Sequence, residues 1–130
     1  MKSEIEAISP FVDELMLKIK EIHCDSGSEF GIELALREAL ANAVMHGNRE
    51  DPQKRVHVRC TCEKGKGVSI VVRDEGPGFD PVTVPDPLAP ENLDAEHGRG
   101  ILLMKQFMDE IHFERGGTEV HMRKALSGSR

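Results

Sequence analysis

The order of apolar and polar positions in the first half of the chain predicts two helices. Ser9 and Pro10 are typical of a helix N-cap and first helical position, and apolar residues then recur at helical spacing to about residue 23. A longer helix is expected over residues 29–46, with Gly47 at a C-cap position.

A period of two in the second half of the chain predicts four strands. Their apolar positions lie in residues 56–62, 68–72, 111–113 and 118–122. The Gly116-Gly117 pair between the last two runs is typical of a hairpin turn.

Three segments do not follow either period. Residues 3–8 alternate weakly and are compatible with a short strand, and residues 48–54 form a polar connection. Residues 80–97 hold four prolines and predict a long loop, a feature that in compact domains is usually functional or disordered. An apolar helix is expected to follow over 101–108.

Helices and antiparallel strands thus come in segregated groups, which predicts a single α+β domain over residues 1–130. We expect a two-layer α/β sandwich, in which the helices cover one face of a mixed, mostly antiparallel sheet.

Composition and charge narrow the functional classes. Apolar residues make up 38% of the chain and charged residues 31%, as in ordinary globular proteins. The net charge of −6 argues against nucleic acid as the main partner, because phosphate binding needs a basic surface. No apolar run approaches membrane-spanning length and the N-terminus lacks the apolar stretch of a signal peptide, so no membrane partner and a cytoplasmic location are expected.

Three polar residues form a stripe along the long helix. Glu38, Asn42 and His46 follow one another at i, i+4 and i+8, with apolar residues on both sides. A carboxylate and an amide in such surroundings are costly unless other side chains or a bound ligand satisfy them. The small Ala35 and Ala39 beside the stripe favour a ligand. His46 fits a helix cap as well as a ligand contact.

Asp74 continues the core-facing register of the second strand. One interpretation is a loop cap that accepts hydrogen bonds from the amides of the following turn. The other is a fixed acceptor for an amino group, such as the exocyclic amine of adenine. Gly76 and Gly78 would then allow a ligand ring to approach the backbone closely.

A second candidate binding motif precedes the helix expected at 101–108. Gly98 and Gly100 would leave free amides at the helix N-terminus, and Arg99 adds a forked donor, which together favour phosphate. The alternative is plain turn chemistry. The chain lacks both the Rossmann fingerprint and the Gly-Lys-Ser/Thr of a P-loop.

Cysteine and histidine spacing indicates neither a disulfide framework nor a metal site. The three cysteines are Cys24, Cys60 and Cys62, and the last two share one side of a strand, so they are expected to be core thiols. A zinc site would need further ligands at suitable spacing. The five histidines other than His46 show no metal-ligand spacing and are expected to be surface or strand residues.

Taken in order, these motifs resemble the ATP-binding fold of gyrases, certain chaperones, sensor histidine kinases and mismatch-repair ATPases, which is the Bergerat fold of the GHKL superfamily. The resemblance covers residues 29–123. It rests on Glu38 with Asn42, on Asp74-x-Gly76-x-Gly78, on Gly98-x-Gly100 and on the late Thr118. Each motif is modest alone, and the ordered set is highly specific.

Within that superfamily the chain resembles the anti-sigma-factor serine-protein kinases of bacterial stress and sporulation switches. Residues 33–47, 72–81 and 98–104 are similar to the boxes of this group. Sensor histidine kinases usually carry a basic residue and an aromatic residue where this chain has His46 and Gly47.

The resemblance implies a role for each motif residue. Asn42 would ligate a Mg²⁺ ion that bridges the phosphates of ATP, and Glu38 would be the general base for an attacking hydroxyl. Asp74 would bind the adenine amine, with Thr118 in support through water. The further ATP-binding residues would be His46, Gly76, Gly78, Gly98, Arg99, Gly100 and Ile101, and residues 80–97 would be a lid.

The implied function is an ATP-dependent serine/threonine-protein kinase and anti-sigma factor. Its partners would be an anti-anti-sigma protein of the STAS type, which it phosphorylates, and a sigma factor, which it sequesters; a homodimer is compatible with the family. The alternative is a nucleotide-gated binding module without kinase activity. Glu38 favours the kinase, because a pure binding module needs no base. A detached sensor-kinase catalytic domain is a third, weaker hypothesis.

Overall fold

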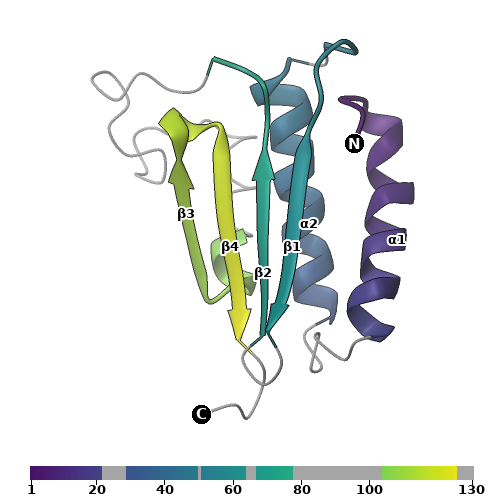
Figure 1. Cartoon of the computed structure of the whole chain (residues 1–130), viewed down its shortest axis with the longest axis vertical. Helices are drawn as coiled ribbons and strands as arrows, with labels where there is room; N and C mark the ends of the chain where they lie inside the picture. The colour runs from purple at the N-terminus through teal and green to yellow at the C-terminus, as the bar shows by residue number, and fades with distance from the viewer. Residues whose placement is uncertain (22–28, 50, 64–66, 78–103, 126–130) are drawn as a thin grey trace.

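The computed structural model describes residues 1–21, 29–49, 51–63, 67–77 and 104–125, which form a helical layer on one face of a four-stranded sheet (Figure 1). The helical elements are η1 (Ile5–Ala7), α1 (Ile8–Glu21), α2 (Glu29–Asn42), the π-helical turn η2 (Ala43–Gly47) and η4 (Arg115–Gly117). The strands are β1 (His57–Glu63), β2 (Gly67–Arg73), β3 (Glu110–Glu114) and β4 (Glu119–Ala125). The predicted α+β sandwich is confirmed.

The sheet has the strand order β1-β2-β4-β3, and each neighbouring pair is antiparallel. Ile70 of β2 lies opposite Cys60 of β1 and Met122 of β4, and Met122 lies opposite Ile111 of β3. Because side chains alternate across a strand, this register turns the apolar positions of all four strands toward the helices. The described strands contain no parallel pair, so the mixed sheet that was expected is antiparallel here.

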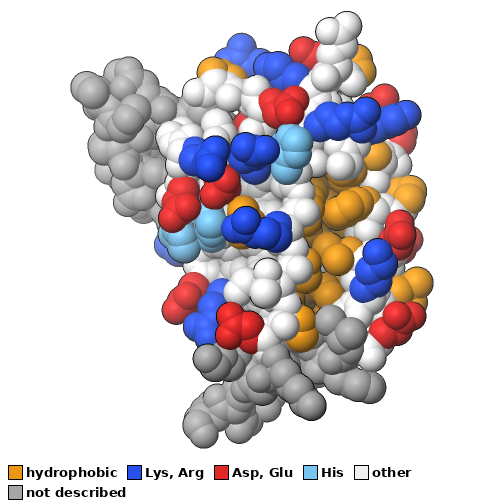
Figure 2. Space-filling view, in the orientation of Figure 1, with side chains coloured by type: hydrophobic (Ala, Val, Ile, Leu, Met, Phe, Trp, Pro, Cys, Tyr) orange, Lys and Arg blue, Asp and Glu red, His pale blue; other side chains and the backbone are white. Residues whose placement is uncertain are grey.

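One hydrophobic core lies between the two layers. Its fully buried side chains include Val12 and Ile19 of α1, Ile32, Leu36 and Leu40 of α2, Val68 and Ile70 of β2, and Met122 of β4. Burying each such side chain contributes about 1.5–3 kcal/mol, so the core holds the layers together. Charged and histidine side chains instead gather on the outer face of the sheet (Figure 2).

Two predictions at the N-terminal end are wrong. Residues 3–8 are not a strand, because η1 occupies Ile5–Ala7 and the only extended pairing there is a single antiparallel bridge from Lys2 to Arg55. α1 begins at Ile8, so Ser9 and Pro10 lie inside its first turn. Proline is tolerated there because first-turn amides have no partner within the helix.

The end of the long helix also differs from the prediction. The α-helical part stops at Asn42 and continues as η2, because the Asn48 N–H donates to the Ala43 carbonyl five residues back, at 2.8 Å. Asn48 is therefore the C-cap residue, and Gly47 lies inside the turn. No helix in the described part of the chain is both long and apolar enough to cross a membrane.

The cysteine prediction is half right. Cys60 is a free, half-buried thiol, and desolvation raises its pKa, as expected for a thiol beside the core. Cys62 is disulfide-bonded, so the free thiol expected there is wrong. Linear spacing could not reveal a bridge, because bridging depends on distances in the folded chain.

Leu40→Ala should lower the free energy of unfolding by about 2–5 kcal/mol, because it leaves a cavity at a side chain that is 0% exposed. Leu17→Ala is the matched control: Leu17 lies on α1, is 61% exposed, and should change stability by less than about 0.5 kcal/mol. Urea unfolding followed by circular dichroism measures both. Equal losses in the two variants would contradict this description of the core.

Candidate functional site

A pocket of about 290 Å³ lies where the C-terminal end of α2 meets the end of β2 and the β3–β4 hairpin. Four residues that the sequence predicted for ligand binding line it, namely Asn42, His46, Asp74 and Thr118. The other lining residues are Ala39, Ala43, Gly47, Arg49, Val72, Pro77, Met104, Phe113, Gly117 and Val120. Apolar walls with a few polar groups are typical of a small-molecule site.

The other predicted site residues are not in the lining. Glu38 is half-buried and lies one helical turn before Asn42, outside the pocket wall. Gly76 is also absent from the wall. Gly78, Gly98, Arg99, Gly100, Ile101 and the loop over 80–97 lie outside the described residues.

Sequence reasoning missed several lining residues. Phe113 and Val120 reach the pocket because β3 and β4 turn these positions toward the helices, and their alternation in the sequence by itself predicts only a core face. Arg49 has a left-handed backbone, with φ of 53°, and no local pattern marks it as a pocket residue.

The end of α2 creates room beside the polar stripe. Ala39 and Ala43 are almost fully buried, and their small side chains leave the space that the pocket occupies next to Asn42. The helix then widens into η2, which carries His46. Single π-turns within helices occur frequently at functional sites, and here the turn forms one wall of the pocket.

Gly47 and Gly76 allow the end of η2 to touch the segment after β2. A Cβ atom on Gly47 would lie 2.2 Å from Asp74 Oδ2, and one on Gly76 would lie 1.9 Å from the Gly47 carbonyl oxygen. Both distances are far below van der Waals contact, so only glycine fits at either position. In the described structure the absence of a side chain at Gly76 thus allows the segment after β2 to contact the end of η2.

The side chain of Asn48 joins three segments of the chain. It is 1% exposed, and its Nδ2 donates to Ser3 Oγ at 3.1 Å and to the Arg55 carbonyl at 3.0 Å. Its Oδ1 accepts the Glu75 N–H at 2.7 Å. A buried amide costs free energy unless its groups are satisfied, and here both ends of the amide are hydrogen-bonded.

The Asp74 carboxylate has one occupied and one open oxygen. Oδ1 accepts the Gly76 N–H at 2.8 Å, as the loop-cap interpretation expects, and the Asp74 N–H donates to the Thr118 carbonyl at 2.9 Å. Within the described part of the chain, Oδ2 accepts no hydrogen bond. Desolvation raises the pKa of Asp74, and it outweighs the Gly76 hydrogen bond and the positive charge of Lys54, which both lower it. An acceptor that is partly buried and half satisfied can bind an amino group.

The Glu75 side chain is not part of the pocket and hydrogen-bonds to residues at the start of β1. Its carboxylate accepts the Arg55 N–H at 2.9 Å and contacts His57 Nε2 at 2.9 Å. The bond from His57 lowers the pKa of Glu75 most, followed by the bond from Arg55. The side chains of these two consecutive residues therefore point in different directions: Asp74 lines the pocket, and Glu75 contacts the start of β1.

Thr118 lies at the end of the hairpin turn, one residue before β4 rather than within it. Its hydroxyl donates to the Arg115 carbonyl at 3.0 Å, which leaves the oxygen free to accept a bond from water or ligand. The turn itself needs positive φ at Gly116 and Gly117, 66° and 93°. The predicted glycine turn is therefore confirmed, and it brings Thr118 to the pocket beside Asp74.

Comparisons with known proteins find a matching family and similar chains. The family model described as "Histidine kinase-like ATPase domain" matches residues 1–124. The chain is 34% identical over 104 residues to "Anti-sigma F factor" of Priestia megaterium, covering 76% of this chain and 71% of the relative. It is 30% identical over 125 residues to "Anti-sigma F factor" of Clostridium novyi, covering 92% and 82%.

A solved structure supports the fold. The histidine kinase domain of the blue-light activated histidine kinase from Erythrobacter litoralis EL346 superposes with a TM-score of 0.59 and 20% sequence identity. The match covers 94% of this chain and 62% of that chain. The predicted Bergerat-type architecture is therefore confirmed.

Asp74→Asn should make the unliganded protein more stable at pH 7. The raised pKa means that the Asp74 carboxyl binds its proton more tightly in the folded protein than in the unfolded chain. The free energy of unfolding therefore falls as the pH rises from 3.8 through the higher pKa of the folded state. Asparagine keeps the acceptor for Gly76 without the charge, and its advantage should shrink as the pH falls below 3.8. Denaturant unfolding across a pH series measures the difference. If Asp74→Asn is less stable than wild type at pH 7, desolvation of the Asp74 carboxylate does not outweigh the interactions that favour its charge.

Proposed function

This chain belongs to the family of histidine kinase-like ATPase domains, and we propose that residues 1–130 form one such domain, which binds ATP and phosphorylates a protein serine or threonine. The observation that carries the proposal is the convergence of Asn42 and Asp74, from α2 and from the end of β2, on one pocket. One supplies a neutral amide and the other a carboxylate, so the two ends of the pocket suit different parts of a nucleotide.

The adenine end of the site is proposed at Asp74. Its open Oδ2 is suited to accept a hydrogen bond from the exocyclic amine, and Thr118 can support a bridging water. Met104, Phe113 and Val72 provide apolar surface for the faces of the base. A buried acceptor of this kind also rejects a ring that lacks the amine, because the carboxylate would then be left unsatisfied.

The phosphate end is proposed at Asn42. Mg²⁺ prefers hard oxygen ligands and is commonly held by one or two protein groups, with phosphates and water completing its shell. The half-buried Asn42 amide at the pocket wall fits this requirement. Bound Mg²⁺ supplies neutralisation of phosphate charge. His46 and Arg49 also line the pocket, and they flank Gly47, which lies against Asp74.

Glu38 is proposed as the general base. It lies one turn before Asn42 on α2, so the two Cβ atoms are about 5–6 Å apart and on the same helix face. In the proposed step the serine or threonine oxygen forms a bond to the γ-phosphorus, the bond from that phosphorus to the bridging oxygen of ADP breaks, and the hydroxyl proton moves to the Glu38 carboxylate. Position and charge neutralisation carry most of such catalysis.

The proposed biological role is that of an anti-sigma factor. The relatives named "Anti-sigma F factor" support a sigma factor as one partner, which the protein would sequester. The phosphorylated partner would be an anti-anti-sigma protein of the STAS type. A pull-down with and without ATP, followed by mass spectrometry of bound proteins and phosphosites, tests both partners. Recovery of the same proteins with no phosphosite would instead support a nucleotide-gated binding module.

Asp74→Asn should weaken ATP binding by about 10- to 150-fold, because it removes a charged acceptor whose hydrogen bond is worth about 1.5–3 kcal/mol. Asp13→Asn is the matched control, since Asp13 is exposed on α1 and should leave the affinity unchanged. Isothermal titration calorimetry gives both dissociation constants. An unchanged affinity in Asp74→Asn would remove this residue from the site.

Glu38→Gln should retain ATP binding and slow phosphoryl transfer to the recovered partner by about 10²–10⁴-fold, because the shape remains and the base is lost. Glu33→Gln is the control: Glu33 lies on the same helix but pairs with Arg37, and its variant should transfer at the wild-type rate. Asn42→Ala should instead lose the Mg²⁺-dependent part of ATP binding. Full transfer by Glu38→Gln would rule out the base assignment.

A further inference from the structure

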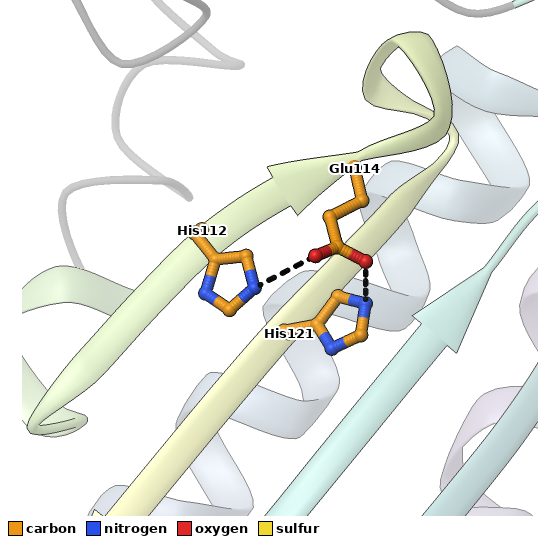
Figure 3. Close-up of side chains that lie close together, drawn as sticks. All are labelled: His112, Glu114 and His121. Carbon is orange, nitrogen blue, oxygen red and sulfur yellow. Dashed lines mark ion pairs between the residues drawn. The ribbon is translucent and has the colours of Figure 1, made fainter.

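A cluster of imidazoles and carboxylates lies on the outer face of the β3–β4 hairpin, away from the helices (Figure 3). His112 of β3 lies directly opposite His121 of β4, and their rings stack with centroids 4.7 Å apart and planes 10° apart. Glu114 and Glu119 form the next cross-strand pair on the same face. The two strands therefore carry mirrored patterns, His-x-Glu and Glu-x-His.

The Glu114 carboxylate bridges one nitrogen of each ring at the edge of the stack. Its Oε1 is 3.4 Å from His112 Nε2, and its Oε2 is 2.9 Å from His121 Nε2 (Figure 3). One ligand atom from each of these three residues lies within 4.8 Å of the others. Glu119 adds a second carboxylate, with Oε1 2.6 Å from the same His121 nitrogen.

The geometry points to a binding site for a zinc-class transition-metal ion, and we propose that His112, His121 and Glu114 are its ligands. Imidazole and carboxylate together are a common ligand set for Zn²⁺. Metal–ligand bonds of about 2.0–2.2 Å in a tetrahedron place ligand atoms roughly 3.3–3.6 Å apart. The separation of His112 from Glu114, 3.4 Å, lies in this range, and that of His121 from Glu114, 2.9 Å, is shorter. Because the stacked rings lie nearly parallel, metal binding requires them to turn so that both Nε2 lone pairs point at the ion.

Charge and exposure also suit a cation. Two carboxylates directly opposite each other in a sheet repel, and a cation between them offsets this repulsion. On the described residues, Arg115 is the cation that pairs with Glu119, at 3.4 Å, while Glu114 has only the histidines. His121 is 22% exposed and His112 58%, so the site has a sheltered side and a side open to water.

Linear spacing concealed this cluster. His112 and His121 are nine positions apart and meet only because the hairpin register pairs them. Both histidines are strand residues, as expected, and their spacing in the sequence gives no sign that their nitrogens meet Glu114 in the folded sheet. These residues lie on the opposite face of the hairpin from the pocket. The zinc proposal therefore does not depend on whether the pocket binds ATP.

The test is titration of the full, tag-free chain with ZnCl₂ by calorimetry, in a background where Cys60 is replaced by serine. We expect one equivalent of zinc to bind, and His112→Gln and His121→Gln each to weaken binding at least tenfold. His57→Gln is the matched control, since the exposure of this strand histidine, 44%, lies between those of His121 and His112 and it contacts a single glutamate; the variant should bind as the parent does.

Two further measurements separate loss of the site from loss of the fold. Zinc should raise the melting temperature of the parent and of His57→Gln but not of the two ligand variants, whose metal-free melting temperatures should match the parent. Co²⁺ in place of zinc should give the visible absorption of a tetrahedral site. Zinc binding unchanged in His112→Gln and His121→Gln, or less than one equivalent bound by the parent, would overturn the proposal.

Discussion

The arrangement of the pocket depends on the hydrogen bonds of one buried amide. The Asn48 side chain connects the N-terminal segment, the residues before β1 and the turn after β2, while its backbone N–H closes η2. Each partner comes from a different element, so none of these segments can shift alone without leaving a buried polar group unsatisfied. The Gly47–Gly76 contact adds a steric limit to this hydrogen-bonded frame. Together they fix Asp74 relative to the end of α2.

That frame maintains a carboxylate in surroundings that do not favour its charge. Burial disfavours ionised Asp74 more than the Gly76 hydrogen bond and Lys54 favour it, and one oxygen remains without a partner among the described residues. Such groups persist where a rigid scaffold over-determines their position, and they are common at binding sites. Stability and the proposed ligand recognition thus make opposite demands on the same side chain, and the core packed between the two layers compensates for the difference.

The sequence predicted those features that local periodicity encodes. Val68, Ile70 and Val72 specify a strand face, and Glu38 and Asn42 lie one turn apart on α2, because both patterns repeat within a few residues. What escaped prediction depends on distant partners. Asn48 falls within a predicted polar connection, yet it is buried by hydrogen bonds to residues 45 and 27 positions away. The π-turn, the Cys62 disulfide and the His112–His121 pair likewise follow from the assembled fold.

The β3–β4 hairpin has two chemically distinct faces. Phe113 and Val120 face the pocket, whereas His112 and His121 face solvent one position away. Substitutions can therefore modify either face without changing the other, which lets two properties of the protein evolve separately. A single-residue insertion or deletion within β3 or β4 has no such freedom: it rotates the strand's alternation by one step, moving a histidine into the apolar wall and a hydrophobic residue into water at once.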